Sequence, residues 1–247
     1  MPDLRDCATP QPLFLTTRWS MVLEARNKES SGSSHALESL CQSYWYPLYV
    51  YIRRQGHAAH DAQDLTQSFF ARLLEKDYLQ SAAREKGRFR TFLLVATKRF
   101  LLNEWDKIRT QKRGGTYVIV SLDEEMAERR YRAEPLDTLP ADEVYDRRWA
   151  LTLLEQAMTR LRGSYIASDR EAEFDYLKTF LTADRNDIPY QGIAESLQMT
   201  EGAARVALHR LRKRFRRFFR EVIADTVSNP EEVDEEVRYV VSILSHD

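Results

Sequence analysis

The sequence predicts an all-α protein with two helical domains joined by a linker, the second domain containing a helix-turn-helix. Three observations favour this fold class. Apolar residues recur at spacings of three and four along most of the chain, only eight of the 247 residues are glycine, and runs of β-branched residues are few. A hydrophobic content of 43% is enough to build a substantial core.

Composition shifts along the chain set the expected domain boundaries. We expect an N-terminal arm with a short helix over 1–33, a first helical domain over 34–115, a linker over 116–141, a second domain over 142–228, and an acidic C-terminal helix over 229–247. In the linker, YVIVSL (117–122) could pair briefly as a strand, and the rest mixes charge and proline without a sustained apolar face.

The first domain is expected to open with a helix over 34–54, which Gly56 ends. An amphipathic helix over 61–76 follows, with Leu65 and Phe69 turned inwards. Three polar residues remain on its outer side: Asp61, Asp64 and Gln67.

Histidines and acids near the start of this second helix have a spacing that a metal site could use. The residues are His57, His60, Asp61 and Asp64. Acids in the first turn of a solvated helix explain the pattern more simply, because they interact favourably with the positive end of the helix. We therefore expect no metal.

The third helix, over 87–115, lies in a basic patch. Residues 84–113 hold ten Lys or Arg against three acids, a net charge of +7, and aromatic residues are interleaved with these cations. Cations beside flat rings suit single-stranded nucleic acid, which needs both phosphate contacts and stacking faces. We interpret Phe89, Phe92 and Phe100 as core residues, and for Trp105 both a core and a stacking role stay open.

The second domain is expected to begin with a helix over 144–161, and the sequence from Ser168 to Glu171 fits a capping box for the next helix. The stretch 188–220 then reads as two helices joined by a tight turn. Pro189 suits the first turn of the first helix, and Thr200 is the expected N-cap of the second.

The second helix of this pair is strongly cationic. Residues 201–220 contain eight Lys or Arg against one acid, a net charge of +7, beside one apolar stripe. Such a helix needs an anionic partner, and duplex DNA offers both phosphates and a groove that admits a helix. A solvated surface helix is less favoured because acids for i,i+4 pairing are missing, and a membrane surface is less favoured because the apolar face must pack.

Several protein classes are excluded by what the sequence lacks. There is no glycine-rich phosphate loop, zinc spacing or nucleophile–base motif, so we predict no enzyme activity and no cofactor. The two cysteines do not suggest a disulfide framework. No apolar run is long enough to span a membrane and the N-terminus does not read as a signal peptide, so we expect a cytoplasmic protein.

Three motifs together resemble the extracytoplasmic-function (ECF) sigma factors of bacterial RNA polymerase. DAQDLTQSFFARLLE is similar to the family's core-binding helix, and GRFRTFLLVATKRFLLNEWDK resembles its promoter-melting helix. YQGIAESLQMTEGAARVALHRLRKR resembles its helix-turn-helix for the minus-thirty-five element. Two positions depart from the family pattern: Arg99 stands where Asn is frequent, and Gln198 where a turn glycine is usual.

The resemblance implies that the chain binds core RNA polymerase, recognises the minus-ten and minus-thirty-five promoter elements, and directs transcription initiation. It is also compatible with a regulatory protein that acts in trans. The implied polymerase contacts are Asp61, Asp64 and Gln67. The implied contacts to the melted minus-ten strand are Arg88, Lys98, Arg99, Asn103 and Trp105. The implied minus-thirty-five contacts are Thr200, Arg205, Ala207, His209, Arg210, Arg212 and Lys213.

An alternative function also uses the DNA-binding helix but involves no polymerase: a helix-turn-helix regulator that binds duplex DNA as a dimer. A sigma factor would be monomeric and bind core polymerase tightly, whereas such a regulator would be dimeric and ignore it. Neither reading gives the promoter sequence, the regulon or the inducing signal.

The C-terminal segment 221–247 has a net charge of −7, with eight acids against Arg238. Asn229 is a suitable N-cap, Pro230 a suitable first residue, and an apolar stripe follows. Two interpretations are open. The helix completes the core of the second domain, or it folds back and shields part of the cationic recognition helix at 201–220.

Overall fold

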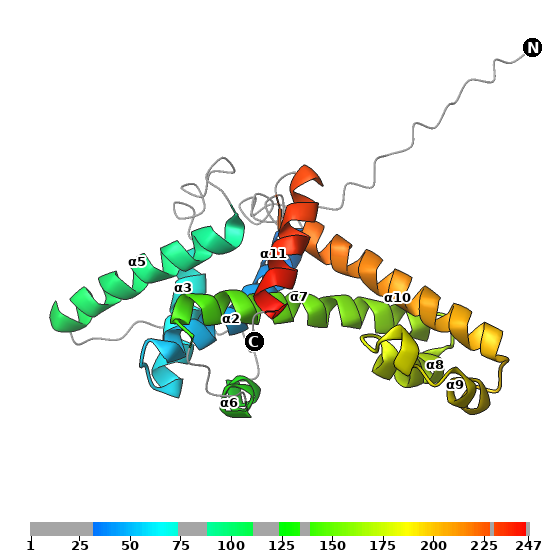
Figure 1. The fold of residues 1–247 in the computed structure, drawn as a ribbon. Helices are drawn as coiled ribbons and strands as arrows, with labels where there is room; N and C mark the ends of the chain where they lie inside the picture. The colour runs from blue at the N-terminus through cyan, green and yellow to red at the C-terminus, as the bar shows by residue number, and fades with distance from the viewer. Residues whose placement is uncertain (1–31, 74–87, 111–123, 134–138, 228–229, 246–247) are drawn as a thin grey trace, which may run out of the picture.

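A computed structural model describes residues 32–73, 88–110, 124–133, 139–227 and 230–245 (Figure 1). All regular elements in these ranges are α-helices or short 3-10 helices, which confirms the all-α class. The predicted N-terminal arm with its short helix, and the segment before the third helix of the first domain, lie outside the described residues apart from their last positions.

Three helices of the first domain form as predicted. They are α2 (Gly32–Arg54), α3 (Ala59–Leu73) and α5 (Phe89–Thr110). Gly56 follows α2 with φ of +94°, a left-handed conformation that ends the helix without the steric cost a Cβ would bring. Aromatic rings fill the space between these helices: Phe69 of α3 and Phe100 of α5 meet edge-to-face at 5.7 Å.

The linker contains a helix that the sequence did not predict, α6 (Glu124–Ala133). Its stability comes from polar and aromatic contacts with α2 rather than from an apolar stripe. Glu128 accepts hydrogen bonds from Tyr49 and from Arg53, the latter at 3.1 Å, and the Tyr131 ring lies edge-on to Tyr49. Ten residues of the expected linker are therefore helical.

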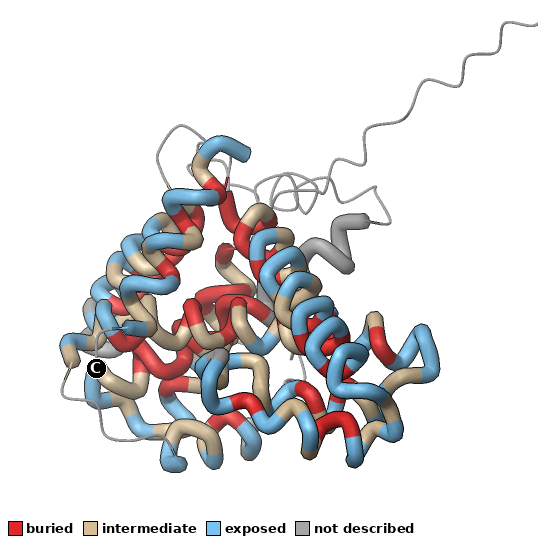
Figure 2. Tube along the Cα trace, turned by 45° about the vertical axis from the view of Figure 1, so that its right-hand side comes forward, coloured by how far each residue is buried: buried red, intermediate tan, exposed pale blue. Residues whose placement is uncertain are grey.

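The longest helix, α7 (Ala141–Ile166), joins the two halves of the molecule (Figure 1). It packs against α2 and against α10 (Glu201–Ala224), and Trp149 in its first half is completely buried. One continuous cluster of buried side chains runs from α2, α3 and α5 through α7 to the C-terminal end of α10. Figure 2 colours the buried positions along the chain red. The structure thus shows one main core shared by residues on both sides of the linker.

A second, smaller cluster lies at the other end of α7. It is built by α8 (Glu171–Leu177), 3-10 helices at Lys178–Phe180 and Arg185–Asp187, α9 (Tyr190–Ser196) and the N-terminal half of α10. The predicted capping box is wrong here. Arg170 is the N-cap of α8 without a side-chain cap, and the Ser168 hydroxyl instead donates to the Ser164 carbonyl oxygen at 3.0 Å.

The acidic C-terminal segment is helical, as predicted. A 3-10 turn at Pro230–Glu232 leads into α11 (Val233–Ser245), which packs on α7 and on the C-terminal part of α10. Val233 and Val240 of α11 are buried in the main cluster. The predicted N-cap, Asn229, lies outside the described residues.

Candidate nucleic-acid interface

The turn between α9 and α10 sets the direction of the recognition helix. Gln198 has φ of +52°, a left-handed backbone that favours glycine, so this glutamine adopts a strained conformation at the expected position. Two residues later Thr200 caps α10, because its hydroxyl accepts a hydrogen bond from the Ala203 N–H at 3.2 Å. The two features together fix where α10 begins.

The first half of α10 exposes a cationic surface. Arg205, His209, Arg210 and Lys213 are all exposed, and Arg205 and His209 line a groove of about 780 Å³. The Arg205 guanidinium lies over the Tyr190 ring at 4.1 Å and 3.6 Å from the Glu201 carboxylate, which holds the side chain against α9. A preoriented arginine loses less rotamer freedom when it meets a base edge.

Two predicted contacts in this helix need correction. Ala207 is only 7% exposed and belongs to the second buried cluster, so its side chain offers almost no surface to a base. Arg212 donates hydrogen bonds to the carbonyl oxygens of Phe180 and Ala183, at 2.8 and 2.5 Å. These bonds make Arg212 a brace between α10 and the preceding loop as well as a cation lining the groove.

Val206 is a surface feature that the sequence reading missed. Its side chain is 48% exposed on α10 between Arg205 and the buried Ala207, and it lines the groove. The signal available in the sequence was a β-branched residue inside a cationic stretch of the helix. Apolar side chains at such positions can contact the methyl group of thymine.

The predicted melting helix, α5, divides its aromatic residues between core and surface. Phe89 and Phe100 are buried and Phe92 is partly buried, as predicted. Trp105 is 61% exposed, which resolves the open question in favour of a surface position. The neighbouring Leu102, 67% exposed, was not anticipated.

A groove of about 410 Å³ adjoins Trp105 and Leu102 and reaches Lys98 and His57, whose ring lies edge-on to the indole at 6.4 Å. Arg99 and Asn103 are exposed on the same helix. The apolar lining, with the Lys98 amino group beside it, suits a flat, charged ligand such as a nucleotide.

Two cations predicted to contact DNA are already paired within the chain. The Lys98 amino group lies 2.5 Å from the Asp142 carboxylate at the start of α7. Arg88, immediately before α5, lies 2.8 Å from Glu235 and 3.0 Å from Glu236 of α11. Acids far along the sequence therefore occupy part of this surface.

Two interpretations were left open for the acidic tail, and the burial of Val233 and Val240 in the main core favours a structural role over shielding of residues 201–220. Among the described residues of α11, the ion pair with α10 joins Asp234 to Arg220 at 2.5 Å, near the C-terminal end of α10. The α10 residues that line the groove run from Arg205 to Arg216, so all of them precede Arg220. The acidic helix instead directs Glu235 and Glu236 at the beginning of α5.

The outer face of α3 carries the predicted polymerase contacts. Asp61 and Asp64 are exposed, Gln67 is partly exposed, and His60 lies 3.5 Å from Asp64. Thr66 and Phe69 are buried on the opposite side. The described residues contain no group of three or more His, Cys, Asp or Glu positioned to hold a metal ion.

In the described part of the chain, the helices are too short or too polar to cross a membrane.

The capped helix-turn-helix and the second, aromatic and cationic helix α5 are together typical of a helical DNA-binding protein. Residues 20–221 match the family described as ECF sigma factor, and the chain belongs to that family. Comparisons with curated proteins and with solved structures gave no match. Family membership assigns the protein a sigma-factor role in transcription initiation, with RNA polymerase and promoter DNA as the implied partners.

Proposed function

We propose that this chain is a promoter-specificity subunit that docks on core RNA polymerase through α3, reads a minus-thirty-five element with α10, and holds the melted minus-ten strand along α5. The observation that carries the proposal is the start of α10. A capped helix follows a left-handed turn and presents Arg205 and Arg210 to solvent. The helix-turn-helix motif places that part of its second helix at base edges.

The contacts within α10 divide into two kinds. Arg205, His209 and Arg210, with the apolar Val206, lie in the N-terminal half and are the base-reading candidates. Lys213, Arg216 and Arg217 lie further along the helix and are exposed, which suits sequence-independent phosphate contacts. Specificity then resides in the first three turns after Thr200.

Strand capture is assigned to α5 because its surface combines stacking and charge. Trp105 and Leu102 offer apolar faces in one groove with Lys98, while Arg99 and Asn103 are exposed on the same helix. Removing a base from the duplex costs a few kcal/mol. Stacking of about 1–3 kcal/mol per base offsets that cost on such a surface.

Polymerase docking is assigned to the acidic outer face of α3, whose family counterpart meets a basic coiled coil of the largest polymerase subunit. Asp61 and Asp64 are exposed and available to a cationic partner. Helices α3, α5 and α10 all pack on one shared core, which fixes their positions relative to one another.

Size-exclusion chromatography with and without core polymerase tests the proposal. We expect the free chain to elute as a monomer and to move to the polymerase fraction when core enzyme is added. Elution as a dimer that stays separate from core enzyme would contradict the proposal and support a duplex-binding regulator.

A further inference from the structure

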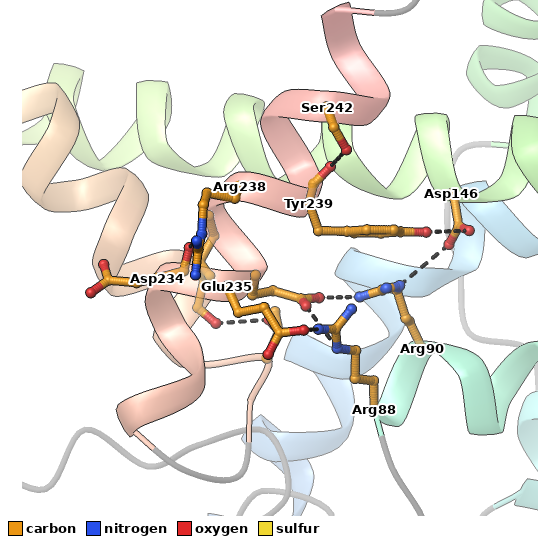
Figure 3. Close-up of polar contacts among 11 residues, drawn as sticks. Arg88, Arg90, Asp146, Asp234, Glu235, Arg238, Tyr239 and Ser242 are labelled. Carbon is orange, nitrogen blue, oxygen red and sulfur yellow. Dashed lines mark hydrogen bonds and ion pairs between the residues drawn. The ribbon is translucent and has the colours of Figure 1, made fainter.

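Helix α11 places two carboxylates against the cations at the beginning of α5 (Figure 3). Arg88 donates a hydrogen bond to Glu235 at 2.8 Å and forms an ion pair with Glu236 at 3.0 Å. Arg90 donates a hydrogen bond to the other oxygen of Glu236. Glu236 thus bridges the two arginines.

The inner part of this cluster is built into the core. The side chains of Glu236 and Arg90 are 2% and 5% exposed. Arg90 also lies 3.3 Å from Asp146 of α7, and its guanidinium stands 4.0 Å from the centre of the Tyr239 ring. Tyr239 in turn donates a hydrogen bond to Asp146 at 2.8 Å (Figure 3). Arg90 therefore contacts Asp146 and the Tyr239 ring in addition to Glu236, and these contacts fix its position.

The outer part of the cluster is open to solvent. The Arg88 side chain is 28% exposed and that of Glu235 is 65% exposed. An ion pair at such a position exchanges readily with another anion, because its partners are already hydrated and bind each other only weakly. The Arg88–Glu235 pair is therefore the exchangeable contact of the cluster, while the Arg88–Glu236 pair has a buried partner.

The same guanidinium is one of the cations assigned to the melted strand. A carboxylate and a phosphate use the same planar donors of arginine, and each carries negative charge, so they compete for one guanidinium. While Glu235 and Glu236 hold Arg88, a strand phosphate cannot use those donors.

We propose that α11 is an autoinhibitory latch, in which Glu235, beside the fixed Glu236, occupies Arg88 until a phosphate of the melted strand displaces it. The inference rests on the proposed role of α5 in strand binding. Val233, Val240 and the Arg90–Glu236 pair keep the helix docked, and the Arg88–Glu235 contact is the part that opens.

Binding of a fluorescein-labelled oligothymidylate to the full-length chain, followed by fluorescence anisotropy, tests the latch. Glu235→Gln removes one charge and one contact to Arg88. Asp234→Asn is the matched control, because it removes the same charge from the same helix but its partner is Arg220 of α10. Any general effect of net charge on DNA affinity appears equally in both variants.

We expect Glu235→Gln to bind about two- to fivefold more tightly than Asp234→Asn, the range set by one exposed ion pair. The gain should shrink as salt is added, and it should vanish in the double variant Glu235→Gln/Arg88→Ala. Equal affinities for Glu235→Gln and Asp234→Asn, or a gain that survives Arg88→Ala, would overturn the latch.

A different pattern would overturn the strand-binding role itself. If Trp105→Ala and Arg99→Ala leave oligothymidylate affinity unchanged, α5 is not the strand site. The latch proposal then fails as well, because it depends on strand binding by α5. If those variants weaken binding while the two acidic variants behave alike, the strand site stands and only the latch is lost.

Discussion

Lys98 Nζ lies 2.5 Å from Asp142 Oδ2, so the first turn of α7 neutralises a cation on the surface of α5 assigned to single-stranded DNA. The two side chains are 41% and 50% exposed, and such a pair stabilises a fold by about 1 kcal/mol or less. We expect Asp142→Asn to leave the free energy of unfolding in urea almost unchanged and to strengthen oligothymidylate binding. A loss of more than about 2 kcal/mol of stability would show that the pair is structural.

The polymerase contact is tested by reversing a charge on α3. Asp64 has a side chain 63% exposed, so Asp64→Arg should not disturb the core but should repel a basic partner. We expect core-polymerase affinity to fall about tenfold or more while the melting temperature stays unchanged. Glu195→Arg, the same reversal at an exposed site on α9, is the control. Equal affinity of both variants for core enzyme would remove α3 from the interface.

Base reading and phosphate contact on α10 are separable by mutation. Arg205→Ala or Arg210→Ala should change preference at particular minus-thirty-five positions, at a cost of about 1–3 kcal/mol where the arginine bonds guanine in bidentate fashion. Arg217→Ala should weaken all duplex sequences alike. Binding to a library of single-base variants measures both effects, and identical losses at every position for all three would mean that α10 is placed wrongly on the groove.

Stacking on α5 is tested with a template that already contains a melted bubble. Trp105→Ala should transcribe poorly from duplex promoters and recover on the bubble, because the cost of opening is then already met. Ile166→Ala removes an apolar side chain of comparable exposure, 47%, at the far end of α7 and should behave as the unmodified protein on both templates. Equal defects of Trp105→Ala on the two templates would point to polymerase docking or folding instead.

The docking of α6 should depend on pH through Glu128. Burial alone would raise the pKa of this carboxyl, but hydrogen bonds from Tyr49 and Arg132 and the charge of Arg53 lower it below its ordinary value. A lowered carboxyl pKa stabilises the fold above the pKa of the unfolded chain, and the contribution is lost as pH falls through the folded value. Glu128→Gln should therefore cost about 1–3 kcal/mol in urea unfolding at pH 7.

The same comparison at lower pH supplies the control. The difference between the unmodified chain and Glu128→Gln should shrink once the pH falls below about 4, the ordinary range of a carboxyl. A difference that stays constant over this pH range would mean that the carboxylate charge is not what holds α6.

Local signals in the sequence predicted most elements of the fold. Helical periodicity located α2, α3, α5, α7 and α10. The Thr200 cap and the turn at Gln198 are confirmed in detail, because both depend on a few neighbouring residues. The exception among local predictions is the cap at Ser168, whose hydroxyl bonds the preceding helix instead.

Long-range pairing could not be predicted from the sequence. The acidic tail has a charge of −7, and both 84–113 and 201–220 carry +7, so charge alone does not say which patch it meets. Packing of Val233 and Val240 on the main core determines which patch the tail meets. It places Glu235 and Glu236 beside Arg88 and Arg90. Helix α6 was missed for a similar reason, since its partners Tyr49 and Arg53 lie on α2.

Two of the predicted site residues on α10 serve the fold in a way that the sequence does not show. Ala207 lies one residue after the exposed Val206, and a step of about 100° around the helix turns it into the core. Arg212 was expected at a phosphate, but two carbonyl oxygens at the end of a loop hold it. Neither carbonyl can be located from the sequence.

In vitro transcription with purified core polymerase across a genomic promoter pool tests the central claim most directly. The account predicts transcripts that start only when the chain is added, from promoters that share a minus-ten and a minus-thirty-five element. Arg205→Ala should alter which promoters are used, and Asp64→Arg should reduce transcription from all of them. No chain-dependent transcript from any promoter, with a chain that is folded and binds duplex DNA, would contradict the account.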